Sequence, residues 1–167
     1  MAMTQQKLVR HVVSLAAAGL AAANISGCSK PESSEPSNKP NSKYQEFDGY
    51  LAEYNSAIKS MTLPRNAMWG AAPTRPPEPM LYARGVGSTR AELTWYCAWE
   101  KEWLAALAEN PRSERHDYAI EQLERVRTLQ LYQVALDEEG RTQIERSLAE
   151  ARRGNPAAVE ADVATNC

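Results

Sequence analysis

The amino-acid sequence predicts an all-α fold, a small bundle of about five helices stapled by a disulfide bond. Apolar residues recur every three or four positions in segments bounded by proline, asparagine and glycine, which is the spacing of a helical face. The stretch Trp95–Leu104 holds three of the four tryptophans. Of the three cysteines, Cys28 is assigned to lipid attachment below, which leaves Cys97 and Cys167 to pair with each other. The 167 residues suit one such domain.

Residues 1–27 are predicted to form a signal peptide. Lys7 and Arg10 give it a positive start, and the run Val12–Ala23 is apolar and too short for a good membrane span. The segment ends in Ile25-Ser26-Gly27-Cys28, which resembles the lipobox of bacterial lipoproteins. The resemblance implies that Cys28 is lipidated, becomes the new N-terminus and anchors the protein to a bacterial membrane. An ordinary secretory signal with a chance cysteine is the alternative.

Residues 28–43 are expected to form a disordered tether. Apart from prolines, Ser29 to Lys43 contain no apolar side chain, so burial cannot offset the entropy of ordering them. Lipobox and tether together predict an extracytoplasmic location, on the cell membrane or the outer membrane. Removal of residues 1–27 takes away two basic residues and no acidic ones, which changes the net charge from −2 to −4.

The helical domain is expected over residues 44–167, and its first helix over Tyr44–Met61. The apolar face of that helix consists of Phe47, Leu51, Tyr54, Ile58 and Met61. A second stripe, formed by Glu46, Tyr50 and Glu53, is interpreted as a solvated face.

A proline-rich loop over residues 62–87 interrupts the helices. We expect Met68-Trp69 and Met80-Leu81-Tyr82 to pin this loop across the helices. The alternative is that Leu63–Tyr82 is a contact surface for a partner, because tryptophan and methionine are common interface anchors. The loop ends in a Gly-x-Gly turn, which could cradle an anion. We interpret it instead as the entry to a helix capped by Thr89 and Glu92, which are spaced as a capping box.

The central helix is predicted over Arg90–Glu109. A helical wheel places Leu93, Cys97, Glu100, Leu104 and Leu107 in one arc, and Tyr96, Trp95, Trp99 and Trp103 widen the apolar side. A helix that is apolar over so much of its surface packs on more than one side. We therefore assign the three tryptophans to the core, with stacking of a ligand on them as the alternative.

Three more helices are expected. Asn110-Pro111 should end the central helix and start a third one, which runs to about Leu136. A fourth is expected over Arg141–Arg153, and Gly154 should stop it. Asn155-Pro156 should start a short fifth helix.

The fifth helix carries Val159, Val163 and Cys167 on one stripe, which turns the last cysteine inwards. Two cysteines left over in an extracytoplasmic protein most simply pair. A bond between Cys97 and Cys167 would close a loop of about 70 residues, worth roughly 4 kcal/mol in the chain-entropy model. Two free thiols are the alternative.

Glu100 is the ionisable residue that the pattern singles out, since its neighbours on the wheel are apolar. A carboxylate in that position must be paired, protonated or at the edge of a cleft. We predict a buried ion pair with Arg127, which also falls on an apolar face. The alternative is that Glu100 is a general acid or base, which would make the protein an enzyme.

We expect no catalytic, metal-binding or cofactor-binding site. The sequence contains no Gly-x-Ser-x-Gly, His-Glu-x-x-His or Cys-x-x-Cys motif. His116, the only histidine after the signal segment, stands next to one aspartate and is not part of a triad. A mildly acidic chain also has no electrostatic footprint for nucleic acid.

The pattern Trp-x-Cys-x-Trp-Glu-x-x-Trp-Leu after a glycine turn, with a terminal Asn-Cys, resembles uncharacterised bacterial secreted proteins and lipoproteins. The matching residues are Gly85, Gly87, Trp95, Cys97, Trp99, Glu100, Asn166 and Cys167. The resemblance implies the helical domain and the disulfide, and no catalytic residue. We therefore expect a non-catalytic, lipid-anchored binding or envelope-associated module with an envelope protein as partner. A structural assembly factor and an enzyme that uses Glu100 are the alternatives.

Overall fold

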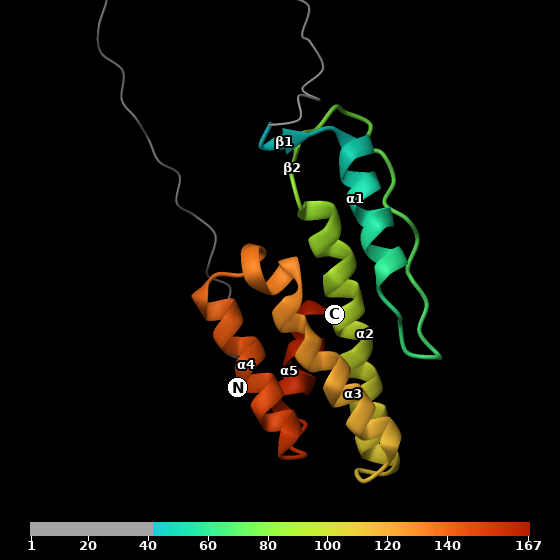
Figure 1. Cartoon of the computed structure of the whole chain (residues 1–167), viewed down its shortest axis with the longest axis vertical. Coiled ribbons are helices and arrows are strands. Elements are labelled where there is room, and N and C mark those ends of the chain that lie inside the picture. The colour runs from blue at the N-terminus through green and yellow to red at the C-terminus, as the bar shows by residue number, and fades with distance from the viewer. Residues whose placement is uncertain (1–41) are drawn as a thin grey trace, which may run out of the picture. The chain divides into compact units, whose positions relative to one another are not determined.

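The computed structural model describes residues 42–167. The helices in that range pack around one central helix (Figure 1). These residues form α1 (Phe47–Ser60), α2 (Val86–Glu109), α3 (Glu114–Glu124), α4 (Glu138–Arg152) and α5 (Ala157–Asn166). Helices α1, α3 and α5 pack directly against α2, and α4 packs against α3 and α5. The predicted all-α bundle is confirmed. The predicted signal peptide, lipobox and most of the tether lie outside the described residues.

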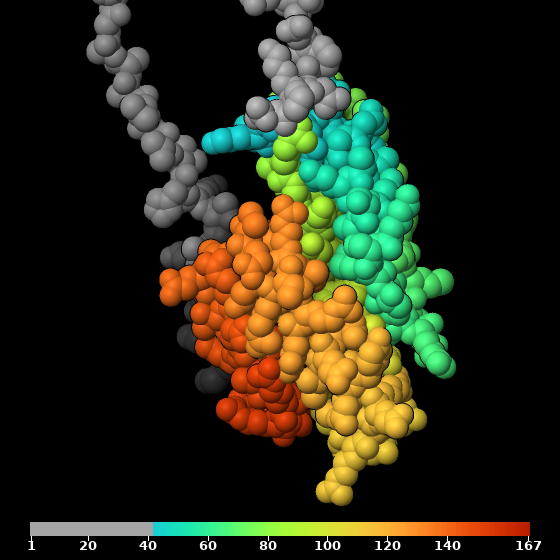
Figure 2. All heavy atoms as spheres, viewed as in Figure 1, coloured from blue at the N-terminus to red at the C-terminus, as the bar shows by residue number. Residues whose placement is uncertain are grey.

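Helix α2 forms the core of the bundle. Trp95, Trp99 and Trp103 are each at most 4% exposed. In the space-filling view, α2 shows only as a narrow green strip between α1 and the orange helices (Figure 2). These tryptophans therefore lie in the core, and Trp99 also lines a pocket of about 610 Å³ at the start of the loop.

A side chain from α1 caps the start of α2. Gly85 is the N-cap residue, with a φ of 90° that favours glycine. The carboxylate of Glu53 accepts hydrogen bonds from Gly85 N at 2.9 Å and from Gly87 N at 3.2 Å. The predicted capping box is wrong, because the Thr89 hydroxyl donates to the carbonyl of Gly85 and Glu92 is buried. The glycine turn does hold an anion at the helix N-terminus, but the anion belongs to this chain.

Gly87 sets how closely α1 and α2 approach each other. A Cβ at this position would lie 2.2 Å from the carbonyl oxygen of Tyr50 and 2.9 Å from the amide nitrogen of Tyr54. Both are backbone atoms of α1, which no change of rotamer can move away. Any side chain at this position would therefore push the two helices apart.

Helix α1 starts at Phe47 rather than at Tyr44. Residues Tyr44–Gln45 (β1) pair instead with Tyr82–Ala83 (β2) in a short antiparallel ribbon. The sequence predicts a solvated face for Tyr50, but this residue is 3% exposed and its ring stacks on that of Tyr82, with centroids 4.6 Å apart. The prediction is wrong because the returning loop covers this side of α1.

The loop between α1 and β2 is anchored to α2 where it begins. The indole N–H groups of Trp95 and Trp99 both donate to the carbonyl oxygen of Thr62, at 2.9 and 3.2 Å. Trp69 packs against the core, partly buried. The indole N–H groups of Trp95 and Trp99 thereby find a partner, and the loop is tied to the centre of the bundle.

The proline-rich part of the loop runs along α1 (Figure 1). Arg75 forms an ion pair with Asp48, and its guanidinium lies 4.9 Å from the centre of the Phe47 ring. Tyr82 closes the loop by stacking on α1. Trp69 and Tyr82 therefore pin the loop, but the prediction is wrong for Met68, Met80 and Leu81, which are 88%, 54% and 58% exposed.

Helix α3 begins after a serine cap. The Oγ of Ser113 accepts a hydrogen bond from His116 N at 3.2 Å. The predicted start at Asn110-Pro111 is wrong, because Asn110 is the C-cap of α2 and its side chain accepts from Arg112 N. The proline belongs to the connecting turn.

The predicted third helix is not continuous. A 3-10 turn, Arg125–Thr128, and a π turn, Leu131–Ala135, follow α3, and Leu129 between them is extended, with φ −86° and ψ 155°. No proline or glycine marks this break. It coincides with a tertiary contact, because the buried carboxylate of Glu92 accepts a hydrogen bond from Leu131 N at 2.5 Å. A carboxylate on α2 thus supplies the acceptor that the broken helix lacks.

Helix α4 starts earlier than predicted, since Asp137 caps it by accepting from Gly140 N at 2.8 Å. Gly154, with a φ of 73°, ends it as predicted. Helix α5 then buries Val159 against the core. None of the described helices is long and apolar enough to cross a membrane.

Candidate functional site

The disulfide joins the last residue of the chain to the middle of α2. Cys97 and Cys167 are bonded, with their Cα atoms 5.6 Å apart, so the predicted pairing is confirmed. The two sulfur environments differ, because Cys97 is 7% exposed whereas Cys167 is open to solvent. The stripe on α5 that carries Val159 inwards also carries Cys167 towards α2.

Glu100 lies one helical turn after Cys97 and has no exposed surface. The predicted ion pair with Arg127 is wrong. The neighbours of the Glu100 carboxyl are Asp162 of α5 and Tyr96 of α2, both within hydrogen-bonding reach. Its Oε2 also lies 3.5 Å from Cys167 Sγ. Glu100 is therefore in contact with a second acid and with the disulfide, and not with a base.

Arg127 belongs to a different cluster. Its guanidinium binds both carboxylate oxygens of Glu145 on α4, at 2.9 and 2.7 Å. The Tyr132 hydroxyl donates to the same carboxylate at 2.9 Å. Arg127 thereby holds the pKa of Glu145 below its ordinary value. The break after α3 turns this arginine towards α4, which is why the prediction failed.

Glu100 is protonated at neutral pH. Burial and the neighbouring charge of Asp162 raise its pKa from 4.5 to about 9. The buried Oε1 of Glu100 makes no hydrogen bond. Burial and Glu100 together also raise the pKa of Tyr96 far above its ordinary value, so the phenol stays neutral. The cluster therefore holds a neutral carboxyl that can donate a hydrogen bond to Asp162.

Asp162 connects the buried cluster to the solvent. It is 7% exposed, and its carboxylate accepts a hydrogen bond from the side chain of Asn166 at 2.8 Å. Together with Tyr96 it lines a pocket of about 270 Å³ between α2, α4 and α5. A proton can therefore reach Glu100 from water through one intervening carboxylate.

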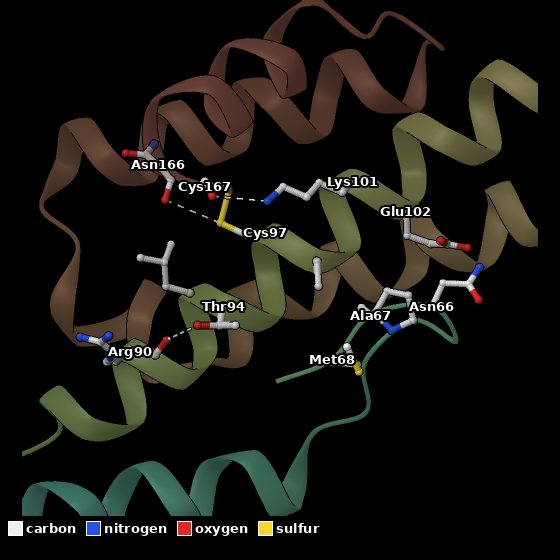
Figure 3. A pocket seen from close by; sticks show the side chains of 13 residues that line it. Asn66, Ala67, Met68, Arg90, Thr94, Cys97, Lys101, Glu102, Asn166 and Cys167 are labelled. Atoms are coloured by element: carbon white, nitrogen blue, oxygen red, sulfur yellow. Dashed lines mark hydrogen bonds between the residues drawn. A yellow bond between two sulfur atoms is a disulfide. The ribbon is translucent and has the colours of Figure 1, made fainter. Parts of the chain in front are cut away.

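A larger pocket of about 690 Å³, called the groove below, lies on the other side of the disulfide (Figure 3). Its walls are the loop at Asn66–Met68, the outer face of α2 between Arg90 and Glu102, and the C-terminal residues Asn166 and Cys167. Both cysteines line it. The groove thus gives solvent and solutes access to the disulfide.

The groove combines apolar side chains with cations. Met68 is 88% exposed and Leu93 is 37% exposed. Arg90 and Lys101 lie on the same face, and Lys101 Nζ is 3.3 Å from the Cys167 backbone oxygen at the end of the chain (Figure 3). An occupant with an apolar group and a negative charge fits this lining.

The described residues do place three possible metal-donor atoms together. One atom from each of Cys97, Glu100 and Cys167 lies within 4.8 Å of the others. Both sulfurs are bonded to each other in this state, and only thiolates are good ligands. The group is therefore no metal centre while the disulfide is intact.

His116 is set apart from this cluster. It is 7% exposed, its Nδ1 lies 3.2 Å from an oxygen of Asp117, and its ring packs 5.8 Å from that of Trp103. A buried ring against a core tryptophan is a packing residue.

Sequence reasoning missed Asp162, although a signal for it was present. Residues 159, 162, 163 and 166 follow the spacing of one helical face. The stripe that turned Cys167 inwards therefore also turned Asp162 inwards. Glu92 was missed in the same way, since it precedes Tyr96 by one turn on the buried side of α2.

Comparisons with protein-family models, with curated proteins and with solved structures found no match to this chain. The resemblance of its motifs to bacterial lipoproteins and secreted proteins therefore stays a prediction.

Proposed function

We propose that the protein is a lipid-anchored, extracytoplasmic binding module without catalytic activity, whose partner is another protein of the bacterial envelope. The anchor would be the lipidated Cys28, and residues 28–43 would link it to the helical domain. The contact surface would be the groove together with the neighbouring loop.

The observation that supports this proposal best is the exposure of the loop. Met68, Met80 and Leu81 are 88%, 54% and 58% exposed, although the loop that carries them is anchored at both ends. Large apolar side chains held in fixed positions in water are typical of interaction surfaces. Met68 lies directly at the groove, so an occupant of the groove would cover it.

The residues that line the groove indicate what kind of partner would bind there. An apolar side chain would fill the space between Met68 and Leu93, and an acidic neighbour would meet Arg90 and Lys101. We therefore expect an envelope protein that presents a segment with an apolar residue next to an aspartate or a glutamate.

The enzyme alternative has less support. A general acid or base must reach the substrate directly or through one water. Glu100 has no exposed surface, and the disulfide lies between it and the groove. The described geometry therefore favours binding over turnover at this residue.

The binding proposal is tested by capture of partners from the envelope with the full-length, tagged protein. Met68→Asp should reduce the recovery of the main partner at least tenfold in quantitative mass spectrometry. Val134→Asp is the matched control, because Val134 is 72% exposed and outside the groove. Equal recovery with both variants would refute the groove as the contact surface.

The anchor is tested separately by labelling cells with a fatty acid. The wild-type chain should incorporate the label, and Cys28→Ala should not, and should remain unprocessed or be released as soluble protein. Incorporation of label by Cys28→Ala would refute the lipobox.

A further inference from the structure

We propose that the Cys97–Cys167 bond is a thiol-exchange site, which a dithiol reduces reversibly in the folded protein while Glu100 and Asp162 deliver the proton to the departing sulfur. The co-reactant class is a dithiol, such as a protein dithiol on the same side of the membrane. This inference goes beyond the proposed binding function and does not depend on what occupies the groove.

The first argument is access. Cys167 is an exposed residue and both cysteines line the 690 Å³ groove, so a thiolate can approach the disulfide from the groove without unfolding of the bundle. Lys101 and Arg90 give this face positive charge, which attracts a thiolate (Figure 3). A disulfide with only a structural role would be better protected by burial of both sulfurs.

The second argument is the asymmetry of the two sulfurs. Attack on the exposed Cys167 makes Cys97 the leaving group, and Cys97 is 7% exposed. A thiolate formed at a buried position is poorly solvated, so it leaves faster if it gains a proton. A Glu100 oxygen lies within 4.8 Å of both sulfurs, and Oε2 is 3.5 Å from Cys167 Sγ. Once the bond breaks, the released Cys97 side chain needs only a small movement towards this carboxyl to take its proton.

The third argument is a route for the proton. Glu100 contacts Asp162, and Asp162 lines the 270 Å³ pocket, which shares Leu93 and Asn166 with the groove. The buried pair therefore connects the sulfur to a second pocket. A disulfide that only stabilises the fold needs neither Glu100 nor Asp162, and a buried pair of acids opposes folding.

The charged and titratable groups around Glu100 come from three helices. Tyr96 and Lys101 of α2 and Asp162 of α5 act on Glu100 directly, and Glu145 of α4 acts on Tyr96. Burial and Asp162 keep the proton on Glu100 up to a pKa of about 9. Glu100 is therefore protonated at neutral pH.

The exchange balances as a two-electron reduction. The thiolate of the dithiol attacks Cys167 Sγ, the Cys97–Cys167 bond breaks, and Cys97 takes the proton of Glu100. The second thiolate of the dithiol then attacks the mixed disulfide at the sulfur of the dithiol. Cys167 leaves as a thiolate and is protonated by water, and Glu100 regains a proton through Asp162. The dithiol is oxidised to a disulfide, and the protein gains two thiols.

The test is the rate of reduction of the full-length protein by dithiothreitol between pH 6 and pH 10. Free thiols are counted by alkylation and mass spectrometry, and circular dichroism verifies that the protein stays folded. Glu100→Gln keeps the shape and the hydrogen bond of the neutral acid but has no proton to give. Glu109→Gln is the matched control, because it makes the same substitution on α2 at an exposed residue that pairs with Arg115 and does not line the groove.

At pH 7, Glu100→Gln should be reduced at least tenfold more slowly than the wild-type protein, and Glu109→Gln at the wild-type rate. The ratio of the wild-type rate to the Glu100→Gln rate should fall towards one above pH 9, because Glu100 then loses its proton. Asp162→Asn should move this fall to lower pH, since Asp162 raises the pKa of Glu100.

Two results would overturn the proposal. One is a rate for Glu100→Gln within twofold of the wild type at every pH. The other is reduction of the wild-type protein only when urea unfolds it. If Glu100→Gln does not fold, Asp162→Asn decides instead, because an unchanged pH profile in that variant also refutes the proton route.

Discussion

Replacement of Glu100 by glutamine should make the protein more stable at neutral pH. The folded protein keeps Glu100 protonated up to about pH 9, whereas the unfolded chain releases that proton at about pH 4.5. The folded pKa is thus the higher one, so the contribution of Glu100 to stability is full below pH 4.5 and is lost as the pH rises towards 9. Glutamine has no such titration and can still donate its amide hydrogen to Asp162.

The size of the effect follows from the proton count. One proton bound only by the folded state lowers the free energy of unfolding by about 1.4 kcal/mol for each pH unit. Between pH 6 and pH 8 the free energy of unfolding of the wild-type protein should therefore fall by about 2.5 kcal/mol, whereas that of the Glu100→Gln variant should not show this fall. At pH 7 the variant should be more stable by up to about 3 kcal/mol.

Urea unfolding at pH 6, 7 and 8 without a reducing agent measures this difference. In this window the carboxylates with ordinary or lowered pKa values, such as Glu145, are ionised in both states and add no slope. Every other titratable group is present in both variants, so its contribution cancels in the comparison. Parallel stability curves for the two proteins would refute the protonation of Glu100, and the pH dependence of the Glu109→Gln variant should follow that of the wild type.

Two further predictions concern the frame that holds this cluster. The Cys97→Ser/Cys167→Ser double variant removes a link of 70 residues, and urea unfolding should show a loss of about 4 kcal/mol; a loss below 1 kcal/mol would contradict a stabilising staple. Gly87→Ala should lose about 2 kcal/mol or more, because its Cβ would meet the backbone of α1. Gly70→Ala is the control and should stay within about 0.5 kcal/mol, since its Cβ meets nothing within 4 Å; equal losses in thermal melts would contradict the close packing of α1 and α2.

The features that sequence could predict depend on periodicity within one helix. The tryptophan stripe of α2 and the inward stripe of α5 are properties of 3.6-residue spacing alone, and the structure confirms both. The pairing of Cys97 with Cys167 required only that both stripes face the same core. The stop at Gly154 is equally local, because it depends on a positive φ that glycine adopts readily.

The features that sequence missed depend on contacts between elements. The break near Leu129 contains no proline or glycine. The hydrogen bond that compensates for it joins Leu131 N to the carboxylate of Glu92, 39 residues earlier in the chain. A wheel drawn through an unbroken helix therefore gave Arg127 the wrong direction, and with it Glu100 the wrong partner. The cap of α2 by Glu53 was hidden for the same reason, since the acceptor lies 32 residues before the glycine that donates.

The groove and the disulfide share a wall, so the two proposed properties constrain each other. Asn166 and Cys167 form one side of the groove, and the bond to Cys97, the contact with Lys101 and the hydrogen bonds of the last turn of α5 hold the end of the chain there. Reduction would release this end and alter the surface that a partner binds. A partner that needs the intact wall binds the oxidised protein more tightly, and by thermodynamic linkage it must then resist reduction to the same degree. Glu100 couples partner binding to reduction of the disulfide. Its proton is needed to break the Cys97–Cys167 bond, and this bond holds the C-terminal wall of the groove in place.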